Sequence, residues 1–167
     1  MKDTRFVEPK AAVMVLAPQN IVATATATNY VDLNLAHGVD FLLSFGAMTS
    51  DSTDTCTVTL EANAVSDTSS SDNSETTLAF QYRLSSAIGA SSYGAITAAT
   101  ASGVAITATD DNKILYVKVD PSAVANAGAY RFVRLVLTPN AEMAACNVSA
   151  VALVEPRYAG NAIPSST

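Results

Sequence analysis

Charged side chains are scarce in this chain of 167 residues: they make up 14% of the sequence, where about a quarter is usual. Only nine residues are Lys or Arg, and they are scattered along a chain whose net charge is −6. Phosphate groups are bound by clustered Lys and Arg, so we expect no nucleic-acid partner. No apolar run approaches the roughly 20 residues of a membrane-spanning helix, so we also expect no membrane contact.

A signal-peptide core and a cysteine framework are both missing. Glu8, Pro9 and Lys10 interrupt the apolar stretch that a signal peptide needs, so we expect no targeting segment and synthesis in a cytoplasm. The chain has two cysteines, Cys56 and Cys146, and each begins an apolar alternating segment. We expect both thiols to be buried and reduced. A single disulfide is the alternative, if the two strands are neighbours.

Residue types that carry catalysis or bind metals are also few. The chain has no Trp and one histidine, His37, which we place with Ala36 and Gly38 in a tight reversal. A lone histidine cannot form a His-rich metal site. No Gly-x-Ser-x-Gly elbow, P-loop or dinucleotide fingerprint occurs. We therefore expect no enzymatic activity and no cofactor.

Acidic loops are the best candidates for metal ligands, because calcium prefers hard oxygen atoms. They lack the Asp-x-Asp-x-Asp-Gly spacing of a calcium loop, and we expect them to stay solvated, with calcium binding as the alternative. Their acidic residues are Asp51, Asp54, Asp67, Asp72 and Glu75.

Alternation of apolar and polar side chains is the dominant pattern of the sequence. It is clearest over residues 56–65, where Val58 and Leu60 alternate with Thr57 and Thr59. Such alternation is typical of antiparallel sheets with one solvated face. We predict strands over residues 30–35, 40–48, 56–65, 76–86, 95–109, 113–120, 130–138 and 146–155, after an extended segment over 11–16.

These strands predict an all-β protein, an antiparallel β-sandwich that is jelly-roll-like, because about eight strands fit two Greek keys. An immunoglobulin-like sandwich is less favoured, since its Cys–Trp–Cys hallmark is missing. We expect residues 95–109 to split near Ser102 and Gly103, and Pro121 and Ser122 to open one helical turn ended by Gly128. The sandwich should span 21–156, with an N-terminal arm and first extended segment over 1–20 and a C-terminal tail over 157–167.

The predicted strand over residues 130–138 is apolar on both faces, which indicates a central position in its sheet. Its first residues alternate aromatic side chains with Arg131 and Arg134, a pattern that also occurs in RNA-binding strands. In an acidic protein we expect these arginines to pair with carboxylates instead.

Three segments of the last third carry a family resemblance. They are the strand ending at Asp120-Pro121, the run Tyr130-Arg131-Phe132-Val133-Arg134, and the strand over 148–153 that leads into Arg157-Tyr158. In this order they resemble small capsid-associated proteins of tailed bacteriophages. The resemblance implies a head decoration (cement) protein, or another minor head component, that forms trimers over the shell and clamps neighbouring subunits.

On this resemblance we expect the chain to lie on the capsid surface of a virion, with the major capsid protein and further copies of itself as partners. The alternatives are another head–tail, tail or baseplate subunit, and a secreted ligand-binding β-sandwich. From the composition of the two arms, we expect the contacts to the shell to come from Phe6, Val7, Pro9, Tyr158, Ile163 and Pro164.

Overall fold

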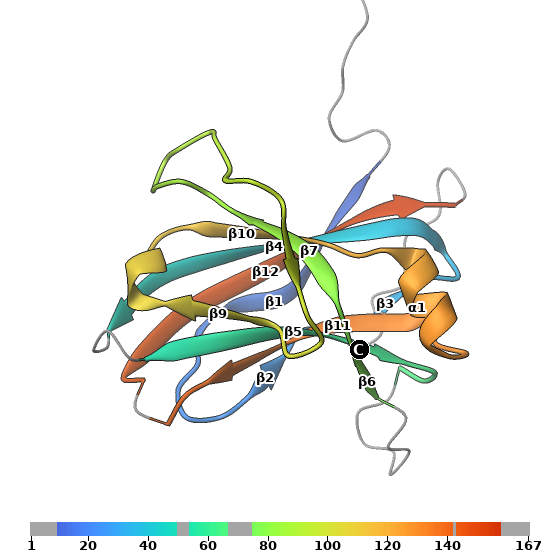
Figure 1. The fold of residues 1–167 in the computed structure, drawn as a ribbon, viewed down its shortest axis with the longest axis horizontal. Coiled ribbons are helices and arrows are strands. Elements are labelled where there is room, and N and C mark those ends of the chain that lie inside the picture. The colour runs from blue at the N-terminus through green and yellow to red at the C-terminus, as the bar shows by residue number, and fades with distance from the viewer. Residues whose placement is uncertain (1–9, 50–53, 67–74, 142, 158–167) are drawn as a thin grey trace, which may run out of the picture.

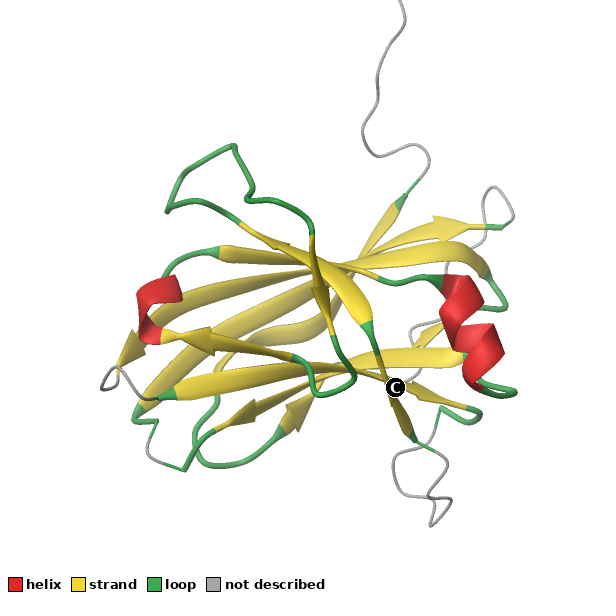
Figure 2. Cartoon of the chain, viewed as in Figure 1, coloured by secondary structure: helices red, strands yellow, loops and turns green. Residues whose placement is uncertain are grey.

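Two antiparallel β-sheets packed face to face form the protein (Figures 1 and 2). The computed structural model describes residues 10–49, 54–66, 75–141 and 143–157. We call the two layers sheet A and sheet B. The strands of sheet A, in spatial order, are β1 (Ala11–Asn20), β12 (Ala145–Pro156), β4 (Ala36–Thr49), β10 (Ile114–Lys118), β7 (Phe80–Leu84) and β8 (Thr97–Ala99).

Sheet B is built around two central strands, β11 (Phe132–Pro139) and β5 (Thr55–Asn63). The central place of β11 confirms the expectation for residues 130–138, and it explains why both of its faces are apolar. Two short strands pair with the far side of β11 and two with the far side of β5. They are β2 (Thr26–Ala27) and β3 (Val31–Asp32) beside β11, and β6 (Thr76–Leu78) and β9 (Val104–Thr107) beside β5.

The strand order is that of a jelly roll. The first four strands of sheet A follow the order β1-β12-β4-β10, and sheet B follows the order β2/β3-β11-β5-β6/β9. The chain alternates between the two layers as it builds these orders, which is the arrangement produced by two Greek keys. The predicted fold class, an all-β jelly-roll-like sandwich, is therefore confirmed.

Residues 76–86 were predicted as one strand, and the structure corrects this. β6 and β7 are separated only by Ala79, yet β6 pairs in sheet B and β7 in sheet A. Leu78 and Phe80 are both buried, so the alternation stays in phase while the backbone changes its partners. In Figure 1 the chain crosses the side of the sandwich at this point.

The chain returns to sheet B between β8 and β9, where residues 100–103 turn. The predicted split near Ser102 and Gly103 is confirmed. Gly103 has φ +84°, and a Cβ atom there would lie 2.3 Å from the carbonyl oxygen of Val58. The crossing therefore depends on a residue without a side chain.

Residues 30–38 also differ from the prediction. β3 ends at Asp32, whose Oδ1 accepts the backbone N–H of Asn34 at 2.9 Å. Such a side-chain hydrogen bond forms a local turn. β4 already begins at Ala36, so His37 lies at the start of a strand, with its side chain exposed, and not in the expected reversal.

Aliphatic side chains and three buried phenylalanines, Phe41, Phe45 and Phe80, fill the space between the sheets. The predicted helical turn is present as α1 (Pro121–Ala127): Asp120 accepts the N–H of Ser122 at 2.9 Å at its start, and Gly128 follows its end. A short 3-10 helix, η1 (Ala108–Asp110), joins β9 to β10. Neither described helix has the length and apolar character needed to cross a bilayer.

Candidate functional site

One row of side chains crosses the outer face of sheet A. The strand register pairs Met14 with Val151, Val151 with Leu42, Leu42 with Tyr116, and Tyr116 with Arg83. Their neighbours along each strand belong to the core or pack against it, so these five side chains point outward. We call them the outer row. Met14, at its far end, is 60% exposed, so the row presents apolar surface that ends in a cation.

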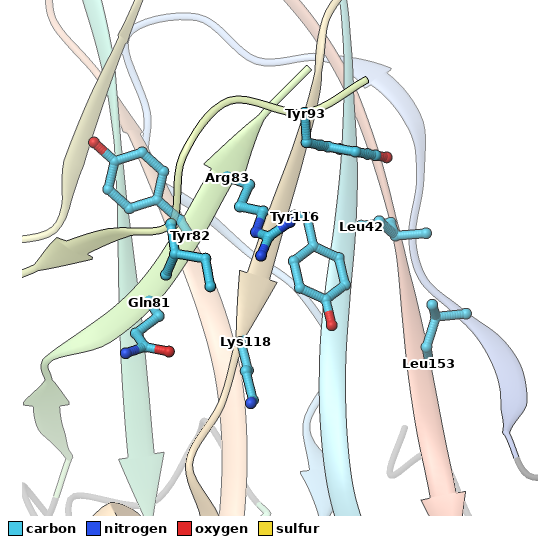
Figure 3. Close-up of a pocket in the computed structure, with 9 residues that line it drawn as sticks. Leu42, Gln81, Tyr82, Arg83, Tyr93, Tyr116, Lys118 and Leu153 are labelled. Atoms are coloured by element: carbon cyan, nitrogen blue, oxygen red, sulfur yellow. The ribbon is translucent and has the colours of Figure 1, made fainter. Parts of the chain in front are cut away.

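A cavity of about 440 Å³ opens at the Arg83 end of the outer row (Figure 3). Leu42, Tyr116 and Arg83 line it from the sheet, together with Leu153 of β12. Its volume lies within the roughly 300 to 1,000 Å³ that is typical of ligand sites. The cavity is therefore large enough to receive side chains of a partner.

The segment over residues 85–96, between β7 and β8, forms another side of this cavity through Tyr93 and Ile96. Its two ends are tied together, because Ser85 bridges to Tyr93 and the N–H of Gly94 donates to the carbonyl of Leu84 at 2.9 Å. The Tyr93 ring meets the Tyr116 ring edge-on, with 6.5 Å between centroids. These contacts hold Tyr93 over the sheet.

Two cations line the cavity, Arg83 on β7 and Lys118 on β10. Neither forms an ion pair or hydrogen bond within the part of the chain that the structure describes. The other described cations all have an acceptor. Lys10 bonds to Asp40, Lys113 to Asp110, Arg131 to Asp32, Arg134 to Glu61 and Glu75, and Arg157 to the carbonyl of Ala36.

Asp40 is the nearest carboxylate on the outer face, where it lies opposite Lys118 in the register of β4 and β10. It accepts a hydrogen bond from Lys10 Nζ at 2.6 Å. Burial, and to a smaller extent the neighbouring Asp40, raise the pKa of Tyr116, so the phenol stays neutral. With Asp40 already paired, the charge left at the cavity is positive.

The outer face of sheet B carries a different cluster, in which every charge is paired. Arg134 donates to Glu61 at 3.0 Å and to Glu75 at 2.7 Å, and its guanidinium lies 4.6 Å from the ring centre of Tyr30. Arg131 pairs with Asp32. The expectation that these arginines bind carboxylates is confirmed, and the cluster leaves no arginine for an anionic ligand.

Cys56 on β5 and Cys146 on β12 meet in the core, where both are fully buried and free of a disulfide. The neighbouring Cys146 thiol, together with burial, raises the pKa of Cys56. Buried, reduced thiols are what the sequence predicts.

Both ends of the sandwich leave sheet A at one corner. Ala11, the first residue of β1, pairs with Val154, and β12 ends two residues later at Pro156. The segments 1–9 and 158–167 therefore continue from neighbouring points. The expected contact residues Phe6, Val7, Pro9, Tyr158, Ile163 and Pro164 lie outside the described residues.

Of the acidic loop residues named as candidate metal ligands, the structure describes only Asp54 and Glu75. Asp51, Asp67 and Asp72 lie outside the described residues. Asp54 accepts from Asn140 at 3.1 Å, and Glu75 is held by Arg134. Within the described ranges, no three His, Cys, Asp or Glu residues gather in a way that could hold a metal ion.

Sequence reasoning missed the outer row and its cavity. A signal was present, because Leu42, Val151 and Leu153 are apolar at positions that the alternation assigns to the solvated face. In comparisons with known proteins, no protein-family model, no curated protein and no solved structure matches this chain.

Proposed function

We propose that this chain is a structural protein of a tailed-phage virion, which binds the outside of the capsid shell as a decoration (cement) protein and stabilises the head. The observation that carries the proposal is that both terminal segments continue from one corner of sheet A, whose outer face bears an apolar row. A domain built in this way can engage neighbouring shell subunits through its two terminal segments and the outer face of sheet A.

Two further observations support a place in the virion. Jelly rolls occur in viral capsid domains, although lectin domains and cupins share them, so the fold alone does not decide the function. The resemblance to capsid-associated proteins covers β10, β11 and β12, which lie at the centre of the two sheets or pair with their central strands. The role proposed for the chain is structural, with no catalysis and no nucleic-acid or membrane partner.

Stabilisation would come from many modest contacts. The partners are the major capsid protein and two further copies of the chain, and a trimer makes each contact multivalent, which raises the effective affinity. The contacts are assigned to Phe6, Val7 and Pro9 in the N-terminal arm, and to the C-terminal arm with Tyr158, Ile163 and Pro164.

The experiment is to purify virions of the phage that encodes this chain, separate heads from tails, and quantify the chain on each by mass spectrometry. We expect it on heads. Phe6→Ser should lower its occupancy about tenfold, because a buried aromatic contact is lost. Val22→Ser is the matched control, since it removes one exposed apolar side chain beyond the opposite end of β1.

Recovery of the chain on tails alone would overturn the decoration role and favour the tail or baseplate alternative. Its absence from virions would leave a secreted ligand-binding sandwich, an alternative that the aromatic cavity favours. Equal occupancy of the Phe6→Ser and Val22→Ser variants would remove the N-terminal arm from the contact.

A further inference from the structure

We propose that the cavity on sheet A binds a carboxylate side chain, carried beside an apolar residue on an extended acidic segment of the shell subunit. This inference rests on the proposed function and names the chemistry of the partner. It assigns Arg83 and Lys118 to the carboxylate, and Leu42 and Leu153 to the apolar neighbour.

The charge at the cavity is opposite in sign to the net charge of the chain. A chain of net charge −6 repels an acidic partner over most of its surface. The cavity is different, because Arg83 and Lys118 lie on adjacent strands, both outward and both without an acceptor in the described chain. A carboxylate placed between them forms charge-assisted hydrogen bonds, which are strengthened where the surroundings exclude water.

The cavity has a cationic half and an apolar half. Figure 3 shows Arg83 and Lys118 on one side of Tyr116, and Leu42 and Leu153 on the other. A ligand that fills both halves has an anionic group and an apolar group side by side. The phosphates of a nucleic acid would use only the cationic half, and a polyanion would meet the repulsion of the whole chain.

The chain has a carboxylate of its own, Asp40, opposite Lys118 in the register of β4 and β10. Asp40 could compete for the two cations, but Lys10 already donates to it at 2.6 Å. Gln81, opposite Lys118, adds an amide to the cationic half. The described lining thus holds two cations without a carboxylate partner, beside neutral polar groups that can both donate and accept.

The surface next to the cavity favours an extended ligand. The cavity opens onto the outer row, which continues over Leu42 and Val151 to Met14 at the edge of sheet A. A free small carboxylate would use the cavity alone, whereas an extended peptide covers the row as well. The row also leads to the strand from which the N-terminal arm continues, so the peptide and the arm would contact the same neighbour.

The test uses two short capped peptides as probes, one with leucine beside glutamate and one with leucine beside glutamine. Each is titrated into the full-length, nitrogen-15-labelled protein by NMR. We expect the glutamate peptide to shift the signals of Arg83 and Tyr93, and to bind about tenfold tighter than the glutamine peptide, since charge-assisted bonds are lost in the latter.

The matched variants remove one positive charge each. Arg83→Gln should weaken the glutamate peptide about tenfold, and Lys113→Gln, whose lysine is held by Asp110 outside the cavity, should leave its affinity unchanged. Equal affinity for the two peptides, or equal losses in the two variants, would overturn the inference. If acetate alone binds as tightly as the glutamate peptide, the assignment to a peptide is wrong.

Capsid occupancy separates this inference from the proposed function. If Arg83→Gln loses the peptide and also leaves the capsid, the cavity is a contact to the shell. If it loses the peptide but decorates heads normally, the assignment to the shell is wrong while the decoration role stands. If the chain never associates with heads, the proposed function fails, whatever the peptides do.

Discussion

At the scale of single residues, burial decides what each ion pair contributes to stability. The side chain of Arg134 is 9% exposed, and it pairs with Glu61, which is 16% exposed. Arg131, the residue before β11, pairs with Asp32 in a similar way, but the side chain of Arg131 is 46% exposed. The first pair is withdrawn from water and the second is largely screened by it.

We predict that Arg134→Met lowers the free energy of unfolding by about 3 kcal/mol, because Glu61 then keeps a charge that is buried and no longer compensated by its partner. Arg131→Met is the matched control, with a smaller loss. Urea denaturation of the two variants measures both changes. A loss in Arg134→Met that is no larger than in the control would show that the ion pair is too solvated to stabilise the fold.

The sequence predicts that Arg131 and Arg134 are paired, since carboxylates are plentiful in an acidic chain. It does not predict that Arg83 and Lys118 have no ion-pair partner among the described residues. That difference depends on which strands are neighbours: Glu61 comes to lie opposite Arg134, whereas Arg83 comes to lie opposite Tyr116. Alternation along one strand contains no information on the partner across from it.

At the scale of strands, the crossing from β6 to β7 is a point where the local pattern and the structure differ. The apolar alternation runs unbroken through Ala79, because Leu78 and Phe80 both point into the core on either side of the crossing. The return crossing was predictable, since Gly103 interrupts its pattern. The glycine therefore predicts the change of direction at residue 103, whereas alternation alone does not predict the change at Ala79.

We predict that Gly103→Ala destabilises the protein by about 2 kcal/mol or more, because its φ of +84° disfavours a side chain and the new Cβ would meet the Val58 carbonyl. Gly38→Ala is the control: a Cβ atom at this position would meet nothing within 4 Å beyond its chain neighbours, and the change should stay within about 0.5 kcal/mol. Thermal unfolding compares them. Equal midpoints would mean that the crossing can shift without cost.

At the scale of the whole molecule, the fold class followed from the number and spacing of alternating segments. The cavity could not be predicted in that way, since Leu42, Arg83, Tyr116 and Leu153 come from four strands that are far apart in the sequence. Only the order of strands in sheet A brings them to one face. The pattern along the chain therefore predicts the class of the fold, whereas the site depends on which strands are neighbours.

We predict that the purified chain is a trimer, with a solution mass of three chain masses of 17.2 kDa each. Trimerisation would make each modest contact to the shell multivalent. Light scattering at several concentrations measures the mass. A monomer at every concentration would contradict the trimer and weaken the decoration role with it.

The shared corner of the two ends has a mechanical consequence. Because β1 and β12 are antiparallel neighbours, pulling their outer ends apart would open the ladder from Ala11 and Val154 onward, one hydrogen-bonded pair after another. A pull on both ends in the same direction instead loads the two strands along their length, against the many contacts that join them to the sheet. Under the proposed function, a shell that holds both arms on one side would therefore load the domain in its stronger direction.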